Sequence, residues 1–324
     1  MAHPLRMACP NIIYDYTTRT IQQRFLLRPS ARLNETVLGA FGRGQQLYPN
    51  VKLYGFAVLS NHIELLISAS DGESCGRFMG FVNGRLGWEI GYKLHAWRGC
   101  FWGRRTRPIP IIDDDALMDR VRYVLEHGVK ENLVDSPRAW PGPSPLPFLL
   151  HGKPLLGTCI DWDSFRRASE AGKQVTPHDF GTEVEVKLSK LPMWEHLSWK
   201  KIQARFARMV TDIEREYAAK RKASGKNPLG VQAILAQHPH GSPAESKHSP
   251  APLCHASSKK LRERFRAAYR AFVDAFREAA KAPKNEAPGV RFPLYCYPPA
   301  RAFVGAQETS ARDGPLWELA LDIG

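Results

Sequence analysis

The order of strand-like and helix-like segments in the first part of the chain limits most strongly how it can fold. Segments rich in β-branched and aromatic residues predict strands, and segments with apolar residues at helical spacing predict helices. The strands are expected at residues 11–20, 51–59, 62–68 and 109–112, and the helices at residues 29–46 and 73–94. This β-α-β-β-α-β order predicts an α+β domain with a ferredoxin-like antiparallel sheet and two helices on one of its faces.

One more helix is expected directly after the last strand. Asp113, Asp114 and Asp115 supply a cap and an acidic first turn, and the helix is expected to run to about His127 and to end at Gly128. In the ferredoxin-like arrangement an added helix of this kind can lie against the other face of the sheet.

Four polar side chains would meet if this added helix packs on the free face. His62 and Glu64 are two residues apart on a strand, so their side chains point to the same face. Tyr123 and His127 are four residues apart on the helix, one turn above each other. Two metal-capable groups on a strand, facing a Tyr/His pair on a helix, are the parts that a metal-assisted tyrosine nucleophile needs.

Three blocks of this sequence resemble single-tyrosine transposases, close to their REP-associated branch. The first block is Tyr54-Gly-Phe-Ala-Val-Leu-Ser-Asn-His-Ile-Glu-Leu-Leu-Ile, which is similar to the strand pair of that family. The second is Phe101-Trp-Gly-Arg-Arg, and the third is Tyr123-Val-Leu-Glu-His-Gly-Val-Lys-Glu-Asn-Leu-Val. The order and spacing of the blocks agree with the family over roughly residues 8–145.

The resemblance implies a His-hydrophobic-His nuclease that acts on single-stranded DNA. It carries the metal ligands onto His62, Glu64 and His127, with Mg²⁺ or Mn²⁺ as the cofactor, and the nucleophile onto Tyr123. The implied product is a 5′-phosphotyrosine with a free 3′-OH. Because each chain has one such tyrosine, strand exchange implies a second active site and hence a homodimer. Glu64 departs from the family pattern, which has a second His there, although a carboxylate is also a good ligand for these hard cations.

Two other functions stay open. A transposase-derived protein that binds DNA without cleaving it is consistent with the carboxylate at Glu64. An RNA-binding module is also conceivable, because RNA-recognition domains share the β-α-β-β-α-β order. Such domains present paired aromatic residues on their central strands, whereas His62 and Glu64 occupy the corresponding strand here.

The charge of the chain predicts a polyanionic partner. The 324 residues carry a formal net charge of +14, and charge of one sign on this scale steers a protein toward nucleic acid or acidic membranes. Arg104, Arg105 and Arg107 follow Trp102 in a basic and aromatic segment that can contact phosphates and unpaired bases. Lys130 is a further candidate. We therefore expect DNA, single-stranded or hairpin, as the partner.

The remaining features predict an intracellular, cytoplasmic location and no membrane partner. The sequence has no run of eighteen apolar residues, and its start lacks the apolar core of a signal peptide. Its six cysteines are scattered, without a Cys-x-x-Cys pair, as expected of a reduced protein.

The composition changes after the first half of the chain. We expect a transposase-like nuclease domain at residues 1–145, a proline-rich and irregular connection at 146–190, and a basic, mostly helical region at 191–324. Amphipathic helices are expected within that last region, at residues 198–223 and 259–281.

Overall fold

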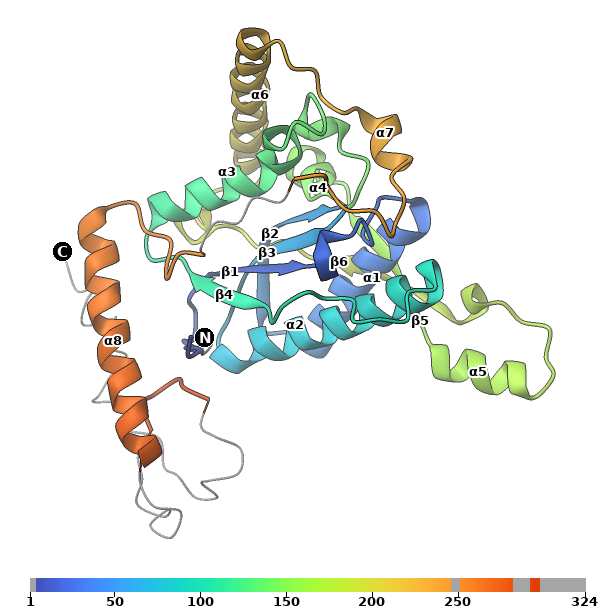
Figure 1. Ribbon diagram of the computed structural model, residues 1–324, viewed down its shortest axis with the longest axis horizontal. Coiled ribbons are helices and arrows are strands. Elements are labelled where there is room, and N and C mark those ends of the chain that lie inside the picture. The colour runs from blue at the N-terminus through green and yellow to red at the C-terminus, as the bar shows by residue number, and fades with distance from the viewer. Residues whose placement is uncertain (1–3, 246–250, 282–291, 298–324) are drawn as a thin grey trace.

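A four-stranded antiparallel sheet forms the centre of the protein (Figure 1). The computed structural model describes residues 4–245, 251–281 and 292–297. The strands are β1 (Tyr14–Arg19), β2 (Val51–Leu59), β3 (His62–Ala69) and β4 (Arg107–Pro110), in the spatial order β2-β3-β1-β4. Each neighbouring pair is antiparallel. The α+β class is thus confirmed.

Helices cover both faces of this sheet. α1 (Ala31–Leu47) and α2 (Gly72–Leu86) lie on one face, and α3 (Asp114–Lys130) lies on the other (Figure 1). Each begins at a side chain that accepts a hydrogen bond from the first turn, namely Ser30, Asp71 and Asp113. A π-helical turn, η2 (Gly87–Leu94), continues α2, so the two together fill the helix expected at 73–94.

Two of the boundaries that were predicted wrongly have a clear reason in the packing. β4 lies at Arg107–Pro110, two residues earlier than expected, because these residues pair with β1. α3 does not end at Gly128 but continues to Lys130. Gly128 serves close packing instead, since a Cβ atom there would lie 3.2 Å from Cε3 of Trp140.

The second half of the chain adds a small hairpin and further helices around the central sheet. The hairpin consists of β5 (Leu155–Ile160) and β6 (Gly181–Val186), with α5 (Trp162–Glu170) between its strands. The later helices are α4 (Leu146–His151), α6 (Trp199–Ser224), α7 (Val231–Leu235) and α8 (Lys259–Lys281). Short 3₁₀ turns occur at η1 (Ile21–Gln23), η3 (Pro137–Ala139), η4 (Pro177–Phe180) and η5 (Pro192–Trp194).

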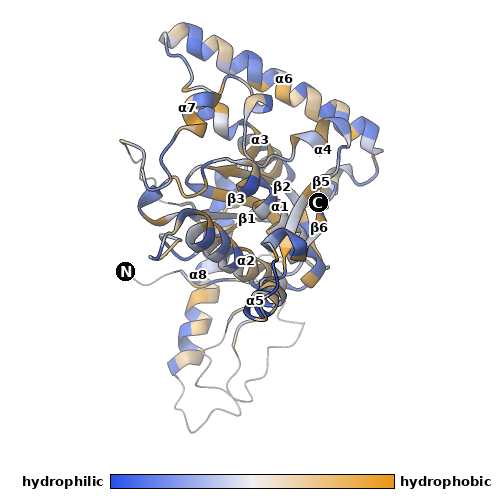
Figure 2. Cartoon of the chain, turned by 90° about the vertical axis from the view of Figure 1, so that its right-hand side faces the viewer, coloured by the Kyte–Doolittle hydropathy of each residue, from blue (hydrophilic) through white to orange (hydrophobic). Residues whose placement is uncertain are grey.

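Side chains from all three predicted regions share one hydrophobic core. Phe41 and Phe56 from the first region pack in the same cluster as Leu155 from the second and Val210 from the third. Along α6, apolar and polar bands alternate (Figure 2), as expected for a helix with one buried face. The domain boundaries themselves stay a prediction. None of the described helices combines the length and the apolar character needed to cross a membrane.

Later segments cover both edges of the sheet. At the β2 edge, Ser189 N donates to Leu53 O at 2.7 Å, and Trp140 Nε1 donates to Val58 O at 3.0 Å. At the other edge, His255 runs beside the end of β4, where Ile112 N donates to its carbonyl at 2.9 Å. These contacts occupy part of each edge, and the covered part is not available to pair with another chain.

The contact between α1 and the added hairpin can be tested with one methyl group. A Cβ atom on Gly39 would lie 2.1 Å from the backbone oxygen of Thr158, so Gly39→Ala forces two backbones apart. We expect it to lower the free energy of unfolding by about 1–3 kcal/mol, measured by urea denaturation. Gly84→Ala on α2 is the matched control, because no atom lies within 4 Å of its Cβ position. That variant is expected to be stabilised by about 0.4–1 kcal/mol, and equal losses in both variants would contradict the packing.

Candidate active site

The two histidines of the predicted site face each other between the sheet and α3. His62 opens β3 and His127 lies in the last turn of α3, and both are 4 % exposed. Their Nε2 atoms are 3.1 Å apart, and their ring centroids are 4.6 Å apart. The packing of α3 on this face therefore brings together residues that are far apart in sequence.

The Nδ1 atoms of both rings are hydrogen-bonded to acceptors. Nδ1 of His62 lies 2.7 Å from the side-chain oxygen of Asn61, and Nδ1 of His127 lies 3.0 Å from Oε2 of Glu64. An amide oxygen and a carboxylate only accept hydrogen bonds, so both Nδ1 atoms carry their protons. Burial, together with the neighbouring His127, lowers the pKa of His62 well below its ordinary value, so this ring is neutral.

Two lone pairs therefore point at each other when both rings are neutral. Nδ1 protonation leaves Nε2 as the acceptor on each ring, and the two Nε2 atoms lie 3.1 Å apart. Neither nitrogen can satisfy the other without something shared between them. A shared proton or a metal cation would satisfy both nitrogens, and neutral imidazole nitrogens are common metal ligands.

Glu64 lies behind His127 rather than beside the two facing nitrogens. Its Oε2 atom accepts from His127, and its Oε1 atom accepts from Arg120. Burial alone would raise the pKa of the Glu64 carboxyl, but the hydrogen bond from His127 and the charge of Arg120 bring it below the ordinary value. Across the described part of the chain, no three His, Cys, Asp or Glu side chains form a preformed metal cage. Direct ligation by Glu64 stays a prediction.

Tyr123 lies beside this pair, on the same face of α3. Its ring centroid is 4.9 Å from that of His127, and the side chain is half-buried. The guanidinium carbon of Arg120 lies 3.9 Å from the ring centroid, and Nζ of Lys130 lies 4.0 Å from it. Burial and then the negative charge of Glu64 raise the pKa of Tyr123, and Arg120 opposes them. The phenol is thus protonated at neutral pH.

Arg120 connects the site to the C-terminal part of the chain, which the sequence did not predict. It forms ion pairs with Glu64 and, at 2.8 Å, with Asp15 of β1. Nε2 of His255 lies 3.0 Å from the same oxygen of Asp15. Burial and the charge of Glu64 raise the pKa of Asp15, whereas the hydrogen bond from His255 and the charge of Arg120 lower it. The spacing of Arg120 from Tyr123 was the one available signal, since residues three apart share a helix face.

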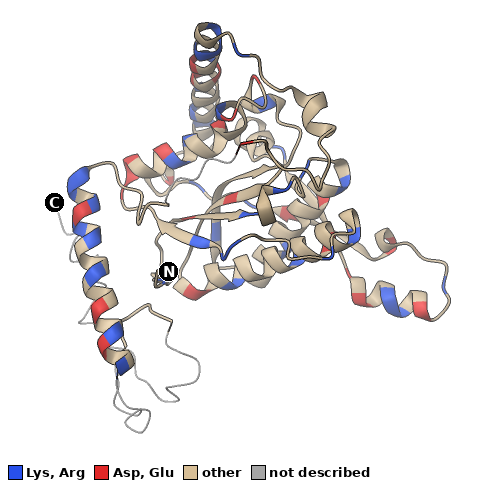
Figure 3. Ribbon diagram, in the orientation of Figure 1, with Lys and Arg blue, Asp and Glu red and all other residues tan. Residues whose placement is uncertain are grey.

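A large cavity of about 730 Å³ opens in front of Tyr123. Its lining includes Tyr123, His127 and Glu64 together with several arginines, and one wall comes from the C-terminal part of the chain. The arginines are Arg6, Arg19, Arg104, Arg105, Arg107 and Arg120, and the C-terminal wall includes Pro252, Leu253, His255, Phe265 and Tyr269. We call this cavity the basic groove. Lys and Arg residues are spread widely along the chain, including α8, which contributes Phe265 and Tyr269 to this wall (Figure 3).

Of the predicted DNA contacts, Arg104, Arg105 and Arg107 line the basic groove, and Lys130 lies over Tyr123. Trp102 is not among the residues of the groove lining. Its Nε1 atom donates to Asn83 O at 2.8 Å, and its ring packs edge-on against Phe101 at 4.7 Å. Trp102 thus anchors the segment that carries the three arginines. Arg6 and Arg19 were missed because isolated arginines in a sequence give no sign of where they gather.

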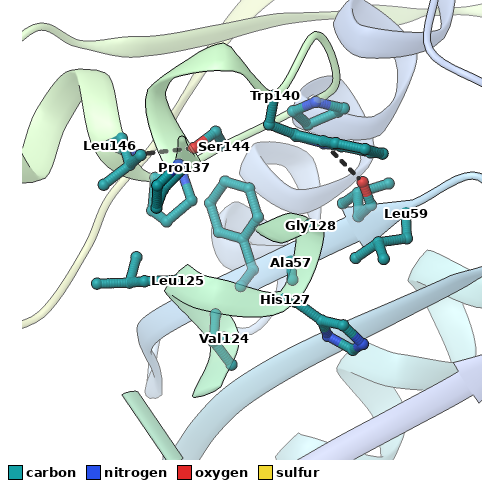
Figure 4. Close-up of a pocket in the computed structure, with 14 residues that line it drawn as sticks. Ala57, Leu59, Val124, Leu125, His127, Gly128, Pro137, Trp140, Ser144 and Leu146 are labelled. Atoms are coloured by element: carbon teal, nitrogen blue, oxygen red, sulfur yellow. Dashed lines mark hydrogen bonds between the residues drawn. The ribbon is translucent and has the colours of Figure 1, made fainter. Parts of the chain in front are cut away.

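A second pocket lies behind α3 and is too small for a nucleotide. Its volume is about 30 Å³, enough for a water molecule. Val124, Leu125, Trp140 and Leu146 line it, with His127 at its edge (Figure 4). Trp140 closes this side by its hydrogen bond to Val58. The basic groove is therefore the space in which a large ligand can reach Tyr123.

Comparisons with known proteins give one distant similarity. No family model and no curated protein matches the chain. Among solved structures, a REP-associated tyrosine transposase bound to a REP hairpin is similar to part of it, with a TM-score of 0.37 and 14 % sequence identity. The match covers 44 % of this chain and 81 % of that chain. A similarity this low assigns neither a family nor a mechanism.

Proposed function

We propose that this protein is a transposase-type DNA nuclease and strand transferase in which Tyr123 attacks a phosphodiester with the help of a divalent cation. One observation carries the proposal. The Nε2 atoms of His62 and His127 face each other at 3.1 Å with their Nδ1 atoms already hydrogen-bonded, and the Tyr123 ring lies next to them at the end of the basic groove.

The two histidines fit a shared Mg²⁺ or Mn²⁺ ion. The Nε2 atoms of His62 and His127 lie 3.1 Å apart, so both could bind one ion placed between them. A bound divalent cation would withdraw negative charge from the phosphate. Glu64 would orient the ring of His127 and increase its basicity, as carboxylates behind metal-bound histidines do. A direct bond from Glu64 to the ion is the alternative within this proposal.

The chain supplies the nucleophile and the positioning. The Tyr123 oxygen would form a bond to phosphorus as the P–O3′ bond breaks, leaving a 5′-phosphotyrosine and a 3′-hydroxyl. The phenolic proton would pass, in net terms, to the leaving 3′ oxygen. Because the phenol is protonated at neutral pH, its deprotonation must accompany attack. Arg120 and Lys130 both pack against the ring of Tyr123 and hold it in place, which contributes to the rate through orientation.

The basic groove fits DNA as the substrate. Arginines on its walls can bind phosphates, and the partner is proposed to be single-stranded or hairpin DNA. The strand order β2-β3-β1-β4 with two helices on one face supports a ferredoxin-like fold for this part of the chain. A homodimer remains proposed. Light scattering of the purified protein measures its mass and so distinguishes one chain from two.

The proposal is tested by a covalent adduct that survives SDS. The protein is incubated with Mg²⁺ or Mn²⁺ and a labelled DNA hairpin that carries single-stranded flanks, using a pool of flank sequences. We expect the wild-type chain to form the adduct and Tyr123→Phe to form none while binding the DNA equally well. Tyr217→Phe is the matched control, because this tyrosine lies on α6, outside the groove lining. An adduct that persists in Tyr123→Phe would contradict the role of this residue.

A DNA-binding protein without cleavage is the second candidate. It is favoured by Glu64, whose two oxygens are both engaged by His127 and Arg120, and by the raised pKa of Tyr123. Tight DNA binding with no adduct on any flank sequence in the pool, with either metal, would support this second function.

A further inference from the structure

We propose that α8 binds the duplex stem of the DNA substrate through a row of arginines that runs beside the basic groove. This inference deepens the proposed function, because it takes DNA as the partner and assigns its paired part to α8. Arg262, Arg266 and Arg270 lie four residues apart, and all three are exposed. Four residues advance an α-helix by about 6 Å, so their side chains form one row along one face.

The row extends along most of α8. Lys259 and Arg277 fall on the same face, so that the five cations lie within an arc of about 80° and span about 27 Å along the helix axis. Lys259 and Arg277 each have a carboxylate partner on α8, Glu263 at 3.8 Å and Asp274 at 3.7 Å. Within the described residues, no carboxylate pairs with Arg262, Arg266 or Arg270. Arg262 donates one hydrogen bond to Ala256 O at 3.2 Å, and Nε of Arg270 donates to Arg266 O at 3.3 Å. The other N–H groups of the three guanidinium groups are available to phosphates.

The apolar side of α8 holds the helix in a fixed position against the rest of the protein. Phe265 and Phe272 are buried, and Phe265 packs with Cys9 and Cys254. The hydroxyl of Tyr269 donates to Leu5 O at 2.9 Å. Orange and blue bands along α8 show this division between apolar and polar positions (Figure 2). Because the apolar face is occupied by the protein itself, it is not free to enter a lipid surface as membrane-binding amphipathic helices do.

The row runs beside the C-terminal wall of the basic groove. Phe265 and Tyr269 line the groove and alternate along α8 with Arg262, Arg266 and Arg270. The helix itself stands outside the body of the protein (Figure 1). A flexible single strand can follow the groove to Tyr123, whereas a straight and rigid row of charges suits the regular phosphate backbone of a duplex. The arrangement therefore assigns the unpaired strand to the groove and the stem to α8.

The test measures DNA binding of the full-length chain carrying Tyr123→Phe, so that cleavage plays no part. Three probes are compared: a hairpin with a single-stranded flank, the same stem as a blunt duplex, and the flank alone. The triple variant Arg262→Gln, Arg266→Gln, Arg270→Gln is expected to lose on the order of tenfold affinity for the hairpin and the duplex, but not for the flank. Its slope of log affinity against log salt should fall by about 2.7, which corresponds to three released counterions.

The matched control removes three exposed cations elsewhere. Lys200→Gln, Lys201→Gln, Arg208→Gln on α6 makes the same change in charge and should leave hairpin affinity within twofold. Thermal unfolding of both triple variants checks that each is folded. Unchanged hairpin affinity, equal losses in both variants, or a loss on the flank alone would overturn the inference. Binding of anionic phospholipid vesicles that depends on the three α8 arginines would also overturn it, in favour of a membrane surface.

The two proposals can fail separately. A wild-type chain that forms no adduct but binds the stem through α8 would remove the nuclease and keep this inference. A triple variant of the three α8 arginines that forms the adduct normally and binds the hairpin with unchanged affinity would keep the nuclease and remove this inference.

Discussion

His62→Ala is expected to reduce adduct formation on the order of a hundredfold or more, at saturating DNA and fixed Mn²⁺ concentration. Loss of groups that only support a metal-bound histidine costs 10–100-fold in typical metal sites, and loss of a ligand itself should cost at least as much. DNA binding should change little, because the arginines of the basic groove remain in place. The rate of adduct formation, measured by quenching in SDS, gives the result.

A second readout of the same variant does not depend on catalysis. If His62 and His127 hold the ion, Mn²⁺ should raise the thermal unfolding temperature of the wild-type protein by mass action and should not raise that of His62→Ala. The exposed His151→Ala on α4 is the matched control and should behave like the wild type in both assays. Adduct formation by the wild type at full rate in EDTA would contradict the metal site.

Arg120→Met is expected to lower the free energy of unfolding by about 3–5 kcal/mol. Removing one partner of a buried ion pair leaves an uncompensated buried charge, and breaking such pairs costs about this much. Arg120 pairs with both Asp15 and Glu64, whose side chains are 2 % and 3 % exposed. Urea denaturation followed by circular dichroism measures the loss, and the variant should also form adduct more slowly because the Tyr123 ring loses a contact on one face.

The neighbouring Arg122→Met is the control for this prediction. Arg122 pairs with Glu126 and Glu216, but its side chain is 29 % exposed. A partly exposed pair contributes roughly 0–1 kcal/mol. A loss in Arg120→Met no greater than that in Arg122→Met would show that Asp15 and Glu64 do not need this arginine. Combining Arg120→Met with Glu64→Gln should recover part of the loss, because one of the unpaired charges is then removed.

The central sheet and its helices follow from the sequence because their patterns are local. Alternating or continuous apolar residues define β2 and β3, and Ser30, Asp71 and Asp113 mark the starts of α1, α2 and α3. The predicted end of α3 was wrong for a physical reason. Glycine is the residue type that often ends a helix, but the ring of Trp140 packs against Gly128 and α3 continues past it.

The hairpin of β5 and β6 could not be assigned because its strands carry little pattern. β6 is exposed at four of its six positions, and β5 depends on glycine contacts with α1 that are visible only in three dimensions. Such strands are stabilised by their place against α1 and not by their own propensity.

The pairs at the centre of the site were predictable, but the groups that support them were not. Spacing of two on a strand and four on a helix placed His62, Glu64, Tyr123 and His127 on facing surfaces. Arg120 looked like any solvated helix arginine, and its partners come from distant segments. The bond between His255 and Asp15 spans 240 residues of sequence, beyond the reach of any periodicity.

The most direct test of the account is to identify the amino acid that becomes linked to DNA. The adduct formed with Mn²⁺ is digested with nuclease and trypsin, and the peptide that carries the residual nucleotide is sequenced by tandem mass spectrometry. The account predicts a 5′-phosphoryl group on the oxygen of Tyr123. A nucleotide on any other residue, or no linked peptide from a DNA that the protein binds and cleaves, would contradict it.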